Sequence, residues 1–349
     1  MITGRASGWA SWGGWSVRLD VAVDALPGRA EAVLARVDVP WSRRWSELAE
    51  IVAELSRRVR GGPGAVAVAR ELAEVLVRAA QGGGQRAAWA ALVERVLDLH
   101  AVACAAEPPD GRELAAWLLW LQTGFAEPPE VRLASYAAAL GEDGLASYRA
   151  EAVARFSRLP VIGFGATGRY DRERWALLRV MEELAEHTGD VDLQVLVLSK
   201  DLSSGWHYLQ VATVLRDAGR SGEALDWVER GLEATGWRGA AARLADLGVD
   251  ECLRAGWVER AVGLRRRAFV ASPSVAAYTR LRAVAVAAGV WAAVREEVFA
   301  EVAGGGADEV LWEVLAVESE SVGAAGGPVP GWLRRLRADL EGRAAGSGR

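Results

Sequence analysis

Apolar residues recur at helical spacing along most of the chain. From Trp41 onward, large apolar side chains return every three or four positions, as in 45–55 and 68–76. This period places them on one face of an amphipathic helix. The one candidate strand, 194–198, lies within a helical pattern, and we expect a helix there too. The pattern therefore predicts an all-α fold.

Glycines in the second half of the chain indicate an internal repeat. Gly189, Gly219, Gly256 and Gly289 follow one another at spacings of 30, 37 and 33 residues. These spacings bracket the period of tetratricopeptide-like helical hairpins. In such hairpins a small residue five positions after the turn lets the two helices approach. Ala224 and Ala261 satisfy this rule, whereas Gln194 and Val294 occupy the same place in the outer repeats. We expect a helical-hairpin repeat array, an α-solenoid, preceded by an α-helical N-terminal domain.

Changes in composition along the chain suggest five segments. They are a Trp/Gly-rich N-terminal segment (1–40), an α-helical domain (41–160), a Gly-rich linker (161–170), the repeat region (171–303), and capping helices with a frayed tail (304–349). The linker contains a G-x-G-x-x-G pattern at 163–168. Because no strand–helix–strand unit surrounds it, we interpret this pattern as an inter-domain loop and not as a dinucleotide site.

Composition and charge narrow the functional classes. The chain has 349 residues, of which 51% are hydrophobic and 25% charged, and this excludes global disorder. Its net charge is −5, and all basic residues except Lys200 are arginines, which we attribute to a GC-rich genome. Two cysteines favour a reducing compartment. Since no apolar run is long enough to span a bilayer, we expect a cytoplasmic protein that does not bind membranes.

No catalytic, metal or cofactor signature stands out. His100 and Cys104 share a helix face, but zinc needs about four ligands at recognisable spacing. No G-x-S-x-G elbow is present for nucleophilic chemistry. We therefore expect no metal, no cofactor and no catalytic residues.

Two groups of residues are candidates for binding a partner. The run 200–208 places Asp201, Trp206, His207 and Tyr208 at a hairpin junction, near the groove where repeat arrays bind peptides. The alternative is that Ser203 or Ser204 simply caps the next helix. The second group is formed by Trp9, Trp12 and Trp15, which either dock on the body of the protein or contact a partner.

Several segments together carry a family resemblance. They are 189–192, 198–204, 208–232, 263–269 and 273–278. They resemble the C-terminal helical region of bacterial SWIM zinc-finger proteins. The C-x-C and C-x-H motif that defines the finger is absent here, so neither zinc nor nucleic-acid binding transfers to any residue. The resemblance implies a helical-repeat module and, by analogy, a protein partner such as an AAA-type ATPase or a VWA-domain protein.

These observations favour a non-enzymatic helical-repeat scaffold that binds a protein or peptide within 170–300, as an accessory subunit of a multi-component bacterial system. One alternative is a nucleic-acid-associated accessory protein that uses two groups of arginines. They are Arg265, Arg266 and Arg267, and Arg334, Arg335 and Arg337. A further alternative is an enzyme whose site assembles in space, with His207 among carboxylates in a pocket.

Overall fold

The computed structural model describes residues 26–81, 85–168, 171–324 and 328–346. Within these ranges the secondary structure is helical, with one isolated bridge between Ile162 and Asp201, and the predicted all-α fold is confirmed. The helices are α1 (Leu26–Ala35), α2 (Trp41–Gly61), α3 (Val66–Ala80), α4 (Arg86–Ala106), α5 (Gly111–Thr123), α6 (Leu133–Ser157), α7 (Arg172–Thr188), α8 (Val191–Leu198), α9 (Gly205–Asp217), α10 (Ser221–Thr235), α11 (Ala241–Arg254), α12 (Val258–Ala271), α13 (Val275–Ala287), α14 (Trp291–Gly304), α15 (Asp308–Ala324) and α16 (Gly331–Gly346).

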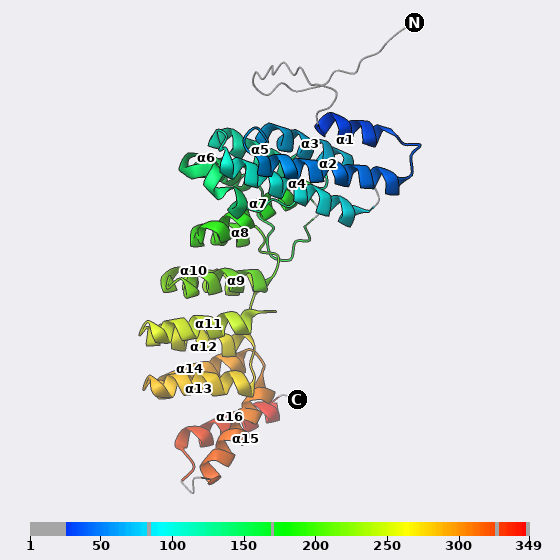
Figure 1. Cartoon of the computed structure of the whole chain (residues 1–349). Helices are drawn as coiled ribbons and strands as arrows, with labels where there is room; N and C mark the ends of the chain where they lie inside the picture. The colour runs from blue at the N-terminus through cyan, green and yellow to red at the C-terminus, as the bar shows by residue number, and fades with distance from the viewer. Residues whose placement is uncertain (1–25, 82–84, 169–170, 325–327, 347–349) are drawn as a thin grey trace. The chain divides into compact units, whose positions relative to one another are not determined.

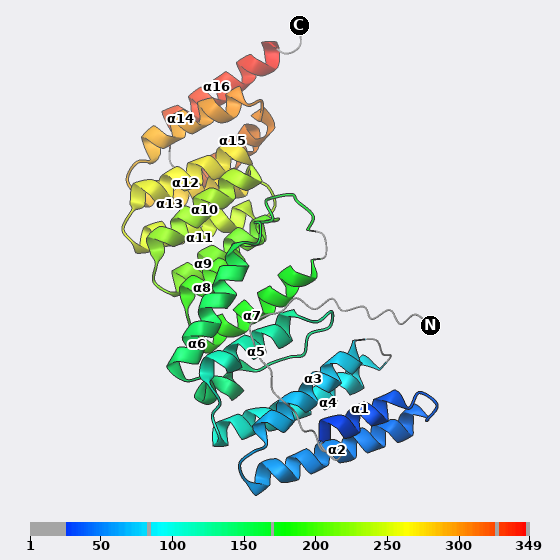
Figure 2. The same ribbon diagram turned by 90° about the horizontal axis from the view of Figure 1, so that it is seen from above.

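The described residues divide into two compact units, which meet between Ala154 and Arg155. This division lies in the last turn of α6, before the predicted linker 161–170. In the first unit, α1 packs on α2 and α3, and α4 packs on both α2 and α3 (Figure 2). Helix α1 lies inside the segment 1–40, so part of that segment contributes to the core through Leu26, Ala30 and Val33.

In the second unit, α9 to α14 form successive helical hairpins. Each helix packs on the one before it, and Figure 1 shows α9/α10, α11/α12 and α13/α14 as consecutive layers. The candidate strand 194–198 lies in α8, a helix whose Asp190 side chain accepts hydrogen bonds from two backbone N–H groups at its start. Apolar character alone did not distinguish strand from helix there, but length and context did.

The glycines that mark the repeat share one backbone conformation. Gly219, Gly256 and Gly289 have φ of 75°, 75° and 73°, the left-handed region that favours glycine. In each turn the residue after the glycine donates its N–H to the carbonyl oxygen five residues earlier. These bonds are Arg220 to Leu215 (2.8 Å), Trp257 to Cys252 (2.7 Å) and Val290 to Ala285 (3.0 Å). The spacing of these three glycines in the sequence therefore reflects the same hydrogen-bonded turn at each of them.

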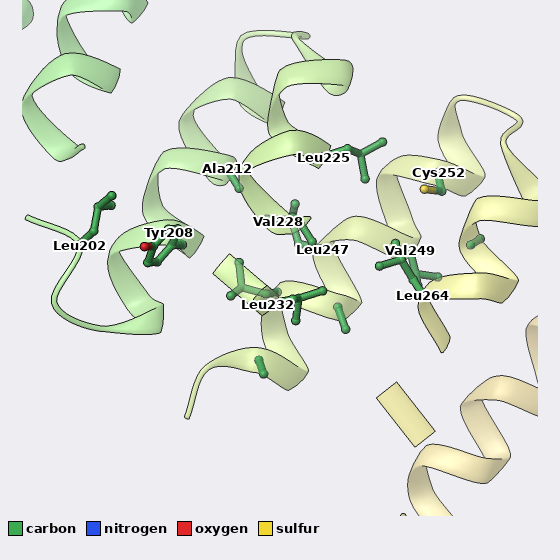
Figure 3. Packing of buried hydrophobic residues seen from close by; sticks show 14 residues of the cluster. Leu202, Tyr208, Ala212, Leu225, Val228, Leu232, Leu247, Val249, Cys252 and Leu264 are labelled. Carbon is green, nitrogen blue, oxygen red and sulfur yellow. The ribbon is translucent and has the colours of Figure 1, made fainter. Parts of the chain in front are cut away.

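Small residues let neighbouring helices of the array approach closely. Ala224 and Ala261 are fully buried, and so is the backbone around Gly231. A Cβ atom at Gly231 would lie 2.7 Å from Tyr208 Cβ and 2.9 Å from Leu244 Cδ1. Figure 3 shows the core cluster to which this contact belongs, which extends across successive helices from Tyr208 through Val228, Leu232 and Leu247 to Leu264. Here packing depends on the absence of a side chain at a single position.

Candidate functional site

The loop between α8 and α9 is held by the segment that precedes α7. Ile162 N donates to Lys200 O (3.0 Å), Leu202 N donates to Ile162 O (2.8 Å), and Gly165 N donates to Ser203 O (2.9 Å). These bonds fix the candidate run 200–208 at its start. The glycine-rich segment 161–168 is thus a structural support for this loop.

Lys200, the single lysine, anchors the same loop from inside. Its Nζ donates to the carbonyl oxygens of Ser157 (3.0 Å), the last residue of α6, and Leu159 (2.8 Å), just after it. Burial, assisted by the positive charge of Arg174, lowers the pKa of Lys200 from its ordinary value. The ammonium group satisfies helix-end carbonyls, which is a structural role.

His207 caps the start of α9. Its side chain accepts from Ser204 N at 3.3 Å, and together with Ser204 it forms a capping box. Asp201 Oδ1 lies 3.4 Å from His207 Nδ1, and the hydroxyls of Ser203 and Ser204 lie 3.5 and 3.4 Å from the same nitrogen. A catalytic triad needs the acid and the nucleophile on opposite ring nitrogens. This cluster therefore has the geometry of a cap.

Asp201 completes the cap with a charged carboxylate. Burial acts to raise its pKa, but hydrogen bonds from Ser203 and the nearby positive charge of Arg174 outweigh burial and lower the pKa below its ordinary value. Asp201 also accepts from Ser203 N at 3.0 Å. Asp201 thereby orders the loop that leads into α9, in which Trp206 lies.

Trp206 is the exposed member of the candidate run. Its side chain is 48% exposed, and the Arg243 guanidinium lies over its ring, 4.7 Å from the centroid. Trp206 precedes Gly219 by 13 residues and Arg243 precedes Gly256 by 13, so they occupy equivalent places in consecutive hairpins. The sequence analysis did not identify Arg243 as a candidate, although its distance from the turn glycine, equal to that of Trp206, could have identified it.

Further polar residues extend this surface along the first helices of the hairpins. Asp246 of α11 lies 3.8 Å from Arg280 of α13, and both are exposed or half-exposed. We call Trp206, Arg243, Asp246 and Arg280 the α9–α11–α13 surface. No carboxylate in the part of the chain that the structure describes pairs with Arg243, so its charge is available to a ligand.

Tyr208 requires a correction. We expected it near the binding groove, but it is only 6% exposed and packs against Gly231 and Trp227, with ring centroids 6.1 Å apart for Tyr208 and Trp227. Helical geometry explains the difference, since Trp206 and Tyr208 are two positions apart and point to different sides of α9. Trp9, Trp12 and Trp15 lie outside the described residues.

The three consecutive arginines of α12 form ion pairs with carboxylates of neighbouring helices. Arg265 pairs with Asp246 of α11, Arg266 with Glu297 (2.7 Å) and Glu301 (3.1 Å) of α14, and Arg267 with Glu229 (2.7 Å) of α10. In the C-terminal group, Arg335 lies 3.2 Å from Glu296. The α12 triplet therefore serves the packing of the array.

The remaining chemistry-bearing group, His100 and Cys104, is buried in the first unit. Burial lowers the pKa of His100 to about 3 and raises the pKa of Cys104 to about 12, so the thiol stays protonated and unreactive near neutral pH. Among the residues that the structure places, no three His, Cys, Asp or Glu side chains converge as metal ligands. Nor does any described helix have the length and apolar character needed to cross a membrane.

No protein-family model matches the chain, and no curated protein sequence matches it at a significant level.

Proposed function

We propose that this protein is a helical-repeat scaffold, tetratricopeptide-like, that binds a protein or peptide partner on its α9–α11–α13 surface. The observation that supports this most directly is the Trp206–Arg243 pair. Tryptophan and arginine are the residue types most enriched among energetically dominant interface residues. A large indole left 48% exposed on an ordered helix offers apolar area that a partner can bury.

The charges around Trp206 suggest what the partner presents. Among the described residues, no carboxylate pairs with Arg243, and the one carboxylate near Arg280 is that of Asp246 at 3.8 Å. We infer a partner segment that carries a carboxylate for Arg243 and an apolar side chain for the Trp206 ring. By the resemblance to SWIM zinc-finger proteins, a bacterial cytoplasmic AAA-type ATPase or VWA-domain protein is the first candidate to test, and the chain would act as its non-enzymatic accessory subunit.

The Trp206→Ala variant is expected to bind the partner about 30-fold more weakly than wild type, an effect typical of a central interface tryptophan. The fold should persist, because the side chain is half in solvent. The partner is first captured from cells of the source organism with the wild-type chain and identified by mass spectrometry. Its affinity for wild type and variant is then measured by calorimetry with purified proteins.

Trp175→Ala provides a matched control. Trp175 is 41% exposed and has Arg179 over its ring at 5.1 Å, yet both residues belong to α7 and lie outside the proposed surface. This variant should retain wild-type affinity. Equal losses in both variants, or unchanged binding by Trp206→Ala, would refute the surface as the binding site.

A further inference from the structure

A cavity of about 460 Å³ lies between α14 and α16, two helices that run beside each other in Figure 2. This volume is within the range of small-molecule sites. Its lining residues are Arg295, Glu296, Phe299, Ala300, Ala303, Trp332, Arg335, Leu336, Asp339 and Arg343. The lining contains three arginines and two carboxylates among aromatic and aliphatic side chains, and one of the arginines, Arg343, also pairs with Asp308 of α15, 3.2 Å away.

Arg295 is the buried charge of this cavity. Its side chain is only 10% exposed, and its guanidinium carbon lies 4.5 Å from the Trp332 ring centroid. The nearest carboxylate, Glu296, is 3.8 Å away, too far for a hydrogen bond, and no residue within the described ranges accepts one from Arg295. Burial lowers its pKa, but a guanidinium remains charged. These N–H donors have no acceptor within those ranges but are not sealed from solvent, so an anion in the cavity can accept hydrogen bonds from them.

Arg335 lies at the solvent edge of the same cavity. It is 67% exposed and lies 3.2 Å from Glu296. A guanidinium carries five N–H donors, so one carboxylate leaves several of them available. Phe299 and Trp332, whose ring centroids are 6.1 Å apart, provide an apolar wall between α14 and α16. A ligand that fits has one anionic end and one apolar end.

We propose that this cavity binds a small organic anion, whose carboxylate or phosphate group contacts Arg295 and Arg335 and whose apolar body packs against Phe299, Trp332 and Leu336. The site is separate from the α9–α11–α13 surface, so it would add ligand control to the scaffold.

The test is calorimetric titration of the full chain with four probes: phenylacetate, phenyl phosphate, neutral phenylacetamide and inorganic phosphate. We expect at least one aromatic anion to bind about tenfold or more tightly than phenylacetamide, because only the anions can pair with the arginines. The ratio between phenylacetate and phenyl phosphate distinguishes a carboxylate site from a phosphate site. Inorganic phosphate should bind more weakly than phenyl phosphate if the apolar wall contributes.

Arg335→Gln should weaken the preferred anion about tenfold, since it removes one charge-assisted contact without changing the core. Arg334→Gln removes the same charge from an exposed neighbour on α16 that does not line the cavity, and it should bind like wild type. Trp206→Ala should also bind the anion normally, which separates this proposal from the partner surface. Absence of anion binding at millimolar concentrations, equal binding of phenylacetamide, or equal losses in both arginine variants would overturn the proposal.

Discussion

Acidification from pH 7 to pH 4 is expected to destabilise the wild-type first unit by about 3 kcal/mol through His100 alone. Burial, together with the positive charge of Arg70, lowers the pKa of His100 from 6.5 to about 3. Between these two values the unfolded chain binds a proton that the folded chain does not. The stabilisation that His100 contributes to the folded state is therefore fully present above about pH 6.5. It is lost progressively as the pH falls toward 3.

The contacts of His100 explain why its neutral form is preferred. The Tyr136 hydroxyl donates to Leu97 O at 2.9 Å, so it can accept a bond from His100 Nδ1–H, 3.1 Å away. His100 Nε2, 3.5 Å from Cys104 Sγ, then accepts from the thiol. We assign this tautomer from the hydrogen-bond network. Protonation of Nε2 would break the thiol contact and leave a charge in a site lined by Trp117, whose ring centroid is 4.6 Å away.

Denaturant unfolding of wild type and His100→Met at both pH values measures this effect. Many carboxylates also titrate over this range, so the relevant quantity is the difference between the two proteins. The variant should be less stable at pH 7 but should lose about 3 kcal/mol less on acidification. A His100→Met protein with the full wild-type slope would show that His100 is not responsible.

Replacing Gly231 by valine is expected to lower the free energy of unfolding of the second unit by about 3 kcal/mol, the upper part of the range for overpacked cores. Even a Cβ atom there would lie 2.7 Å from Tyr208 Cβ, and both atoms are close to the backbone and cannot rotate away. The added methyl groups would force α9 and α10 apart. Denaturant unfolding monitored by circular dichroism reports the change.

Gly222→Val isolates the steric cause. Gly222 belongs to the same helix, α10, and has no atom within 4 Å of a built Cβ. Its substitution should leave stability within about 0.5 kcal/mol of wild type, as is usual at the surface. Similar losses at both positions would mean that β-branching in α10, and not contact with Tyr208, sets the cost.

The sequence predicted the local features of this fold and few of the tertiary ones. Helices and the glycine turns follow from residue spacing, because period and positive φ are properties of a few adjacent residues. Helix α1 was missed, since the tryptophan- and glycine-rich composition of 1–40 masked a short amphipathic stretch from Leu26 to Ala35. Burial of Tyr208 also eluded prediction, because it depends on Gly231 in the next helix.

In the candidate surface, too, a local feature could be predicted and a tertiary contact could not. Trp206 was identified by its aromatic character, but its partner Arg243 is 37 residues away in the sequence. Only the equal distance of both residues from a turn glycine connects them. The α14–α16 cavity has no such signal, since α16 is not a repeat helix in register with the others. Its position arises from packing on α15 and from Leu333, Leu336 and Leu340, which belong to the core cluster of this end of the chain.

The three consecutive arginines of α12 influence which helices of the array unfold locally first. Successive residues of an α-helix point about 100° apart, so one turn of α12 meets α10, α11 and α14 through three side chains. Each exposed ion pair contributes about 1 kcal/mol or less. Helix α12 cannot separate from one neighbour without disturbing another, whereas terminal helices have fewer neighbours to lose. Backbone amides of α12 should therefore exchange their hydrogens late, and local unfolding should begin at the ends of the array.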